Sequence, residues 1–182
     1  TRPYDILVER LREVADLRGI EALLGWDQQT YMPPKGNNAR ARQMALLTSL
    51  AHQKFTAPDL GELLDGLAAD GKLKEEEKAQ LRETKRDRDR AVKLPNELVK
   101  EISECAAQAH TVWVEARAKR DFSYFAPILG KLIALKKREA ETLGYESGGT
   151  AYDALLDQFE PGACVRTLDP ILSRTRDIVV PA

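Results

Sequence analysis

Apolar residues recur at intervals of three and four positions along most of this chain, the spacing that places them on one face of an α-helix. The first segment with this pattern covers residues 5–27, and its apolar positions are Ile6, Leu7, Leu11, Val14, Leu17, Ile20, Leu23 and Leu24. Pro33, Pro34 and Gly36 follow it. Because proline cannot continue the hydrogen-bond ladder of a helix, these residues predict where the first helix ends.

The same spacing predicts helices through the rest of the chain. A second helix is expected over residues 38–54, with Asn37 or Asn38 as its N-cap, because asparagine side chains accept hydrogen bonds from free backbone N–H groups. The other predicted helices cover Pro58 to about Gly71, 73–93, Asn96 to about Arg120, Asp121 or Ser123 to Gly144, Ala151 to Pro161, and about 164–178. In one of them the residues expected to face inward are Leu98, Ile102, Cys105, Ala106, Ala109, Val112, Trp113 and Ala116. The next one has a thick apolar stripe that consists of Phe122, Phe125, Ile128, Leu129, Leu132, Ile133 and Leu135.

The predicted fold class is all-α. No stretch alternates apolar and polar residues as a strand does, and no repeat of fixed period occurs. We expect about seven helices joined by short loops, in one all-helical region over residues 1–182. Segments 73–93 and 95–120 are expected to form an antiparallel pair, since only a short break separates them.

Residues 73–93 are dominated by charge, with acidic residues first and basic residues after them, an order that suits the helix dipole. The few apolar residues available for its buried side are Leu73, Ala79, Leu81 and Val92. We interpret this segment as a solvated helix. A nucleic-acid-binding arm is disfavoured, because the bases of KRDRDR alternate with acids.

The composition is that of a soluble globular protein, with 43% hydrophobic and 31% charged residues. A formal net charge of −1 disfavours binding to nucleic acid or to an anionic membrane. No apolar run approaches the roughly 20 residues of a membrane span, and charges in TRPYDILVERL disfavour a signal peptide. The cysteines, Cys105 and Cys164, are too few for a disulfide framework, so we expect reduced thiols in a cytoplasmic protein. The missing initiator Met and the apolar ending RTRDIVVPA favour truncation.

The sequence contains no complete catalytic apparatus. Its two histidines, His52 and His110, have no partner at metal-ligand spacing, and structural roles are favoured for both. There is no H-E-x-x-H, C-x-x-C or phosphate-binding loop, and no serine lies in a nucleophile elbow. We therefore expect no catalytic residue and no metal ligand in this chain.

One run is unusual in a segment where a helix is about to stop. It consists of Trp26, Asp27, Gln28, Gln29, Thr30, Tyr31, Met32, Pro33 and Pro34. The favoured interpretation is structural: the Trp26 indole packs against the next helix, and the Asp27 carboxylate binds nearby backbone or an arginine such as Arg40 or Arg42. The alternative is that this corner lines a binding cleft.

This run, in the stretch LLGWDQQTYMPPKG followed by ARARQMALLTSLAH, resembles the N-terminal region of the carboxypeptidase Taq family, also called thermostable carboxypeptidases 1. Three more segments agree in the family's order: KLPNELVKEISE at 93–104, the run at 121–145, and AYDALLDQFEPG at 151–162. The resemblance therefore extends from about Tyr4 to Gly162 and beyond.

The resemblance implies a neurolysin-like, all-helical zincin fold in a cytoplasmic homodimer that releases C-terminal amino acids from peptides with broad specificity. It also implies zinc, held by the two histidines of H-E-x-x-H and a downstream glutamate. None of these ligands lies in this chain. Residues 26–34 would belong to the helical wall or lid of the cleft, with no catalytic or metal-binding role.

Two interpretations follow. In the first, the chain is the N-terminal part of a zinc metallocarboxypeptidase, is inactive by itself, and exposes an apolar surface that favours self-association. In the second, it is a free-standing helical protein with an interaction or regulatory role, which pairs with a full-length relative.

Overall fold

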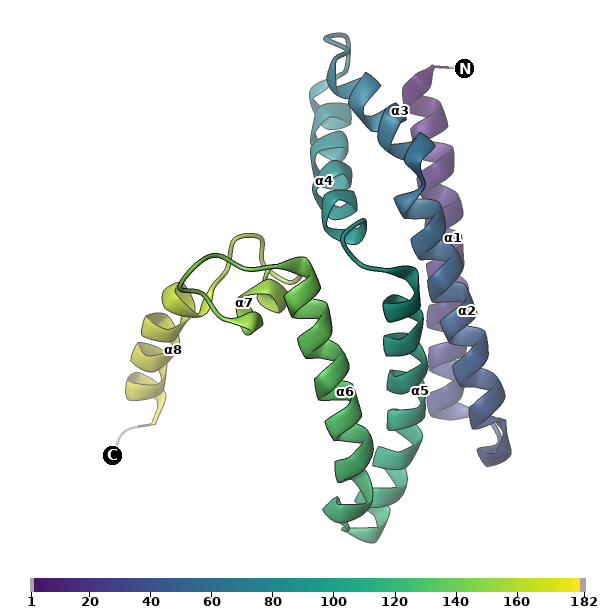
Figure 1. Cartoon of the computed structure of the whole chain (residues 1–182), viewed down its shortest axis with the longest axis vertical. Coiled ribbons are helices and arrows are strands. Elements are labelled where there is room, and N and C mark those ends of the chain that lie inside the picture. Colours follow the sequence, from purple (N-terminus) through teal and green to yellow (C-terminus); the bar gives the residue numbers. More distant parts are fainter. Residues whose placement is uncertain (1, 181–182) are drawn as a thin grey trace. The chain divides into compact units, whose positions relative to one another are not determined.

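The computed structural model describes residues 2–180, and within them all regular secondary structure is helical. The all-α prediction is confirmed, with eight α-helices in the described residues where about seven were expected. The elements are α1 (Pro3–Thr30), η1 (Pro34–Gly36), α2 (Asn37–Thr56), α3 (Pro58–Ala68), α4 (Glu75–Ala91), α5 (Asn96–Lys119), α6 (Phe122–Leu143), α7 (Ala151–Leu156) and α8 (Val165–Val179). Figure 1 shows their order along the chain.

The chain divides into two compact units, residues 1–135 and 136–182, and the boundary falls inside α6. The first unit holds α1 to α5 and most of α6, and the second holds the end of α6 with α7 and α8.

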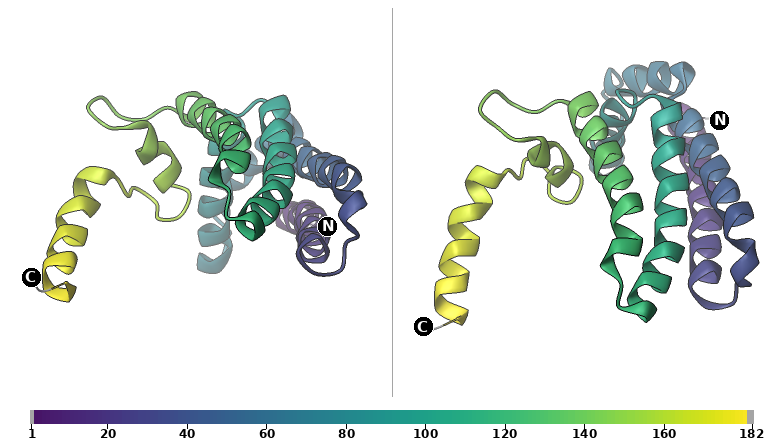
Figure 2. Two further views of the ribbon diagram at one scale, coloured as in Figure 1. Left: turned by 90° about the horizontal axis from the view of Figure 1, so that it is seen from below. Right: turned by 60° about the horizontal axis from the view of Figure 1, so that its bottom comes forward.

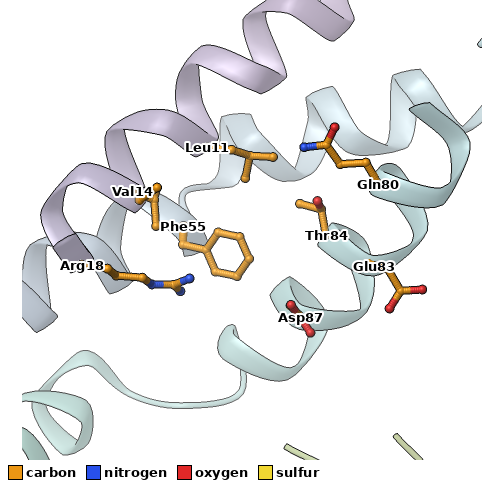
Figure 3. Close-up of a pocket in the computed structure, with 9 residues that line it drawn as sticks. Leu11, Val14, Arg18, Phe55, Gln80, Glu83, Thr84 and Asp87 are labelled. Carbon is orange, nitrogen blue, oxygen red and sulfur yellow. The ribbon is translucent and has the colours of Figure 1, made fainter. Parts of the chain in front are cut away.

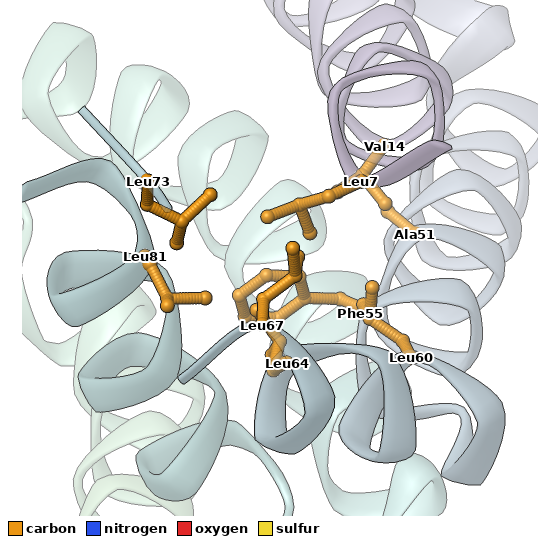
Figure 4. Packing of buried hydrophobic residues seen from close by; sticks show 9 residues of the cluster. All are labelled: Leu7, Val14, Ala51, Phe55, Leu60, Leu64, Leu67, Leu73 and Leu81. Atoms are coloured by element: carbon orange, nitrogen blue, oxygen red, sulfur yellow. The ribbon is translucent and has the colours of Figure 1, made fainter. Parts of the chain in front are cut away.

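The core of the first unit lies where α1, α2, α3 and α4 meet (Figure 4). Leucines at positions 60, 64 and 67 place three apolar side chains on one face of α3, and all three are at most 2% exposed. The full cluster consists of Leu7, Val14, Ala51, Phe55, Leu60, Leu64, Leu67, Leu73 and Leu81. Burial of these side chains is the main favourable term that holds the four helices together.

Helix α2 lies between α1 and α5, and the contacts are close because small residues form the interface (Figures 1 and 2). Ala41 and Ala45 are completely buried. Polar side chains add hydrogen bonds across it: the Thr48 hydroxyl donates to Glu21 of α1 at 2.6 Å and lies 2.9 Å from the Ser103 hydroxyl of α5. These three helices therefore form one tightly joined layer.

The predicted antiparallel pairing of segments 73–93 and 95–120 is wrong. Helix α4 packs against α3 and α2, whereas α5 packs against α2, and α4 and α5 follow one another in the same direction (Figure 1). The connection between them does not reverse, because the Leu94 carbonyl is held by the His52 ring of α2 at 2.9 Å and Pro95 leads directly into the next helix. The short connection between the two segments led to the prediction of an antiparallel helix pair, and the contact between the Leu94 carbonyl and His52 of α2 prevents that arrangement.

The antiparallel neighbour of α5 is α6. The chain reverses at Arg120, which adopts the left-handed conformation with φ 53°, and Asp121 then caps α6 by accepting the Ser123 N–H at 3.0 Å. The apolar cluster that joins the two helices consists of Leu98, Ile102, Cys105, Ile128, Leu132 and Leu135, together with Leu94 from the connection before α5. Of the two capping residues considered for α6, Asp121 performs the role.

The predicted apolar stripes are wider than the faces that the helices bury. Trp113 is 41% exposed, so the inward placement expected for it is wrong. Phe122 and Ile133, from the stripe of the next helix, are 69% and 47% exposed. Ala106 is also exposed, and Ala107 is the buried alanine beside it. Sequence spacing shows which helix face is apolar, but the positions of neighbouring helices decide how much of that face is covered.

Helix α4 is charged and largely exposed, as predicted, but its buried face includes polar groups. Glu77 and Thr84 are 7% and 8% exposed, whereas Val92 is 45% exposed. The Arg88 guanidinium donates to the carbonyls of Thr56 and Ala57, at 3.3 and 3.0 Å, where α2 ends. This arginine thus satisfies carbonyl groups that a helix end leaves free.

In the second unit, Asp153 joins α7 to the start of α8. One of its carboxylate oxygens accepts the Thr150 N–H at 2.7 Å and the other accepts the Val165 N–H at 2.6 Å. These bonds hold the pKa of the carboxyl group below its usual range. Gly149 fits closely beside it, since an added Cβ would lie 2.9 Å from the carboxylate and 3.1 Å from the Glu146 carbonyl oxygen.

Candidate functional site

The run at 26–34 forms the corner where α1 ends and α2 begins. Helix α1 continues through Thr30, and it closes when the N–H groups of Tyr31 and Met32 both donate to the Asp27 carbonyl. Pro33 and Pro34 follow and cannot donate, so the helix stops where the sequence predicts. Residues 26–30 therefore occupy the final turns of α1.

The Asp27 carboxylate forms the predicted ion pair, and its partner is Arg40 at 2.5 Å. The Arg40 side chain is only 12% exposed, and its guanidinium also donates to the Leu24 carbonyl of α1. Arg42, the other arginine considered, has no such contact among the described residues. A charge-assisted contact of this kind is stronger than a neutral hydrogen bond, so it fixes α2 against the end of α1.

Gln28 joins the corner to α5. Its side-chain amide donates to the Ala107 carbonyl at 2.9 Å and to the Asn37 carboxamide oxygen at 3.2 Å. The Thr111 hydroxyl of α5 donates to the same oxygen at 2.7 Å. The predicted N-cap role of Asn37 or Asn38 is wrong: Gly36 is the N-cap of α2, and the Asn37 side chain serves this three-helix junction instead.

The aromatic residues of the corner face outward. Trp26 is 54% exposed and Tyr31 76%, so the predicted packing of the indole against the next helix is wrong. The two rings contact each other edge to face, with centroids 5.5 Å apart. The corner thus presents an exposed aromatic pair on a rigid base formed by Asp27 and Gln28.

The remaining residues of the run also differ in whether they face solvent or the protein interior. Gln29, Thr30, Pro33 and Pro34 are exposed, and Met32 turns inward toward Gly36. The one carboxylate of the run is held in the ion pair with Arg40. The corner therefore has the character of a structural joint with an exposed aromatic face, and its one carboxylate is not free for acid–base chemistry.

The histidines and cysteines have structural environments. Burial lowers the pKa of His52, whose ring contacts the Leu94 carbonyl, and His110 lies beside the Trp113 ring at 6.1 Å. Cys105 is 1% exposed and burial raises its pKa, which confirms it as a small core residue. Both cysteines are free. Within residues 2–180, no three potential ligands lie together as a metal site would require.

A cavity of about 420 Å³ lies between α1, α2 and α4, and the sequence did not indicate it (Figure 3). Its α1 wall consists of Leu11, Val14, Ala15 and Arg18, its α4 wall of Gln80, Glu83, Thr84 and Asp87, and Phe55 of α2 completes it. The residues of each wall recur at helical spacing and therefore lie on one face of their helix. On one helix alone, such a face would be an ordinary surface. Only the tertiary arrangement makes the two surfaces face each other.

Comparison with known proteins identifies the family of the chain. The family model described as "Carboxypeptidase Taq (M32) metallopeptidase" matches residues 6–182. The chain belongs to this family. The resemblance predicted from residues 26–34 and the three later segments is thereby confirmed.

The relatives of this M32 chain are considerably longer. Thermostable carboxypeptidase 1 of Thermus thermophilus is 36% identical over 184 aligned residues, which cover 96% of this chain and 36% of that protein. The crystal structure of BsuCP is 31% identical with a TM-score of 0.94, and the match covers all of this chain and 36% of that one. The M32 carboxypeptidase from Deinococcus radiodurans R1 is 32% identical with a TM-score of 0.78 and the same coverage. The chain therefore spans about a third of the length of these relatives.

Among the described residues, no helix combines the length and apolar character needed to cross a membrane.

Proposed function

We propose that this chain is the N-terminal part of a zinc-dependent metallocarboxypeptidase that releases C-terminal amino acids from peptides with broad specificity. The observation that carries the proposal is the family match over residues 6–182, together with the superposition on BsuCP at a TM-score of 0.94. The chain by itself is expected to be inactive. The zinc ligands belong to a part of the protein outside these 182 residues.

Within that enzyme, we assign residues 1–182 to one helical region that forms a wall or lid of the substrate cleft. The corner at residues 26–34 supports this role, since Asp27 and Gln28 fix it to α2 and α5 while Trp26 and Tyr31 remain exposed. Exposed aromatic side chains on a rigid support are suited to contact with another part of the protein or with substrate.

A cytoplasmic homodimer is the assembly that we propose. Free cysteines, with no disulfide among the described residues, agree with a reducing compartment. Large apolar side chains exposed on several helices agree with further burial in an assembly. Nucleic acid is not expected as a partner, because the net charge is close to zero.

The proposal can be tested by comparing the 182-residue chain with the full-length protein that carries it. Release of the C-terminal residue from a short peptide should occur only with the full-length protein, stop on removal of metal by a chelator, and return with zinc. The same peptide with an amidated C-terminus is the matched control and should remain uncleaved. Activity of the 182-residue chain, or chelator-resistant activity of the full-length protein, would contradict the proposal.

The second candidate is a free-standing helical protein that uses this region for interaction or regulation. The exposed apolar side chains of α8, among them Ile171, Leu172 and Ile178, would suit a partner surface in that case. An immunoblot of source cells with an antibody against this chain separates the two candidates. A band several-fold heavier than 20.4 kDa supports the enzyme, and a single band at 20.4 kDa supports the free-standing protein.

A further inference from the structure

The cavity between α1, α2 and α4 is lined by one cation, Arg18, and by two carboxylates, Glu83 and Asp87. Glu83 pairs with its neighbour Arg82 at 3.1 Å. The Arg18 guanidinium lies over the Phe55 ring, 5.3 Å from its centroid, and has no ion-pair partner within residues 2–180. Asp87 stands on the opposite wall, where its recorded ion-pair contact is with its neighbour Arg86 at 3.4 Å. Figure 3 shows both side chains directed toward the space between the helices. This cavity therefore offers a cation and an anion to a bound molecule.

Two further polar groups of the α4 wall are available. Thr84 is only 8% exposed, yet its hydroxyl has no hydrogen-bond partner in the described part of the chain. Gln80 uses its carbonyl oxygen to accept the Tyr4 hydroxyl, which leaves its amide N–H groups free to donate. Both groups can therefore bond to a ligand in place of water.

The cavity also has an apolar wall. Leu11, Val14 and Phe55 line it, and Val14 and Phe55 are 3% and 6% exposed. The volume of about 420 Å³ lies within the range of roughly 300–1,000 Å³ that is typical of small-molecule sites. A bound molecule must therefore combine an apolar part with hydrogen-bonding groups.

We propose that this cavity binds a free α-amino acid with an apolar side chain. Its carboxylate would accept hydrogen bonds from Arg18, its ammonium group would donate to Asp87, and its side chain would lie against Phe55. Both protein charges are exposed and solvated, so a bound molecule that carries two opposite charges can replace water at each of them, whereas a singly charged molecule can do so at only one. A zwitterion satisfies both and fits the available volume.

This inference rests on the proposed function only for its biological meaning. Hydrolysis at a peptide C-terminus produces free amino acids, so the cavity would make the N-terminal helices responsive to product. Binding itself requires only the residues of α1, α2 and α4.

Isothermal titration of the metal-free full-length protein with L-phenylalanine tests the proposal. We expect saturable binding with a Kd of about 1 mM or tighter. N-acetyl-L-phenylalanine lacks the ammonium group and L-phenylalaninamide lacks the carboxylate, and each should bind at least about tenfold more weakly because it loses one charge contact. Equal binding of the three compounds would overturn the proposal.

Three variants assign the binding to this cavity. Arg18→Gln and Thr84→Val should each weaken binding of L-phenylalanine, by about tenfold and severalfold respectively. Arg12→Gln is the matched control on the same helix, since Arg12 is exposed and pairs with Glu9 outside the cavity. No saturable binding, or binding that both cavity variants leave unchanged, would overturn the proposal.

A hydrolysis assay on the same preparation, reloaded with zinc, keeps the two proposals separate. An active enzyme without this binding refutes only the amino-acid site. An inactive protein with this binding refutes only the carboxypeptidase function.

Discussion

At the scale of single residues, the corner of α1 and α2 depends on a charge that is nearly removed from water. The Arg40 side chain is 12% exposed, and Asp27 is its carboxylate partner. Asp27→Ala leaves this guanidinium without its counter-charge, so we expect the free energy of unfolding to fall by about 1–3 kcal/mol. Urea denaturation monitored by circular dichroism measures the change. Glu9→Gln, which breaks the exposed pair with Arg12, is the control and should cost less than about 1 kcal/mol; equal costs would refute a special role for Asp27.

Arg120 carries backbone strain at the reversal between α5 and α6. It is the non-glycine residue with positive φ among the described residues, and φ 53° is a conformation that a Cβ disfavours. Arg120→Gly should raise the stability of the protein by about 1 kcal/mol, because glycine adopts this conformation without the steric penalty. Thermal unfolding measures the gain. Arg120→Ala retains the Cβ and should give no such gain; a similar rise in both variants would show that the arginine side chain, and not the backbone, is responsible.

At the scale of secondary-structure elements, Asp153 controls how α7 meets α8. Its folded-state pKa is lowered by the Thr150 and Val165 N–H groups, so its stabilising effect is present above the ordinary aspartate pKa of about 3.9 and is lost as the pH falls through the lower folded value. Asp153→Asn should reduce the hydrogen-exchange protection of the Val165 amide already at neutral pH, because a carboxamide has one acceptor oxygen in place of two.

The matched control for this junction is Asp169→Asn, a similar substitution within α8. It should leave the protection of the Val165 amide and its pH dependence unchanged. If protection at Val165 did not depend on pH between about 5 and 2 in the unsubstituted protein, the assignment to Asp153 would be wrong.

At the scale of the whole molecule, the 182-residue chain exposes many large apolar side chains and has little net charge to oppose association between copies. Large apolar side chains of α1, α5, α6 and α8 are more than 40% exposed, among them Leu23, Trp113, Phe122 and Leu172. With a formal net charge of −1, electrostatic repulsion between copies is weak. We expect the isolated chain to self-associate with rising concentration and to bind a hydrophobic dye such as ANS.

Sedimentation velocity over a concentration series measures this self-association. Leu172→Glu should weaken it, and Arg174→Gln, on the same exposed helix, is the control that should not. A chain that remains monomeric at every concentration and does not bind the dye would contradict the expectation.

The sequence by itself determined the features that depend on neighbouring residues. Apolar spacing predicted all-helical structure, Pro33 and Pro34 predicted where α1 ends, and Asp121 was one of two residues expected to cap α6. These features arise from backbone hydrogen bonds and side chains within a few positions of one another, so they can be inferred without the fold. The run at 26–34 likewise indicated the family, because its residues are contiguous.

The tertiary structure decided what depends on residues far apart in the chain. His52 anchors Leu94 and so prevents the expected pairing of α4 with α5, and Gln28 finds its partners on α2 and α5. The exposure of Trp26 and the facing of Arg18 toward α4 also depend on where other helices lie. The position of a side chain in the helical repeat shows the direction in which it leaves its own helix. Only the packing of that helix against others decides whether the side chain meets protein, solvent or a cavity.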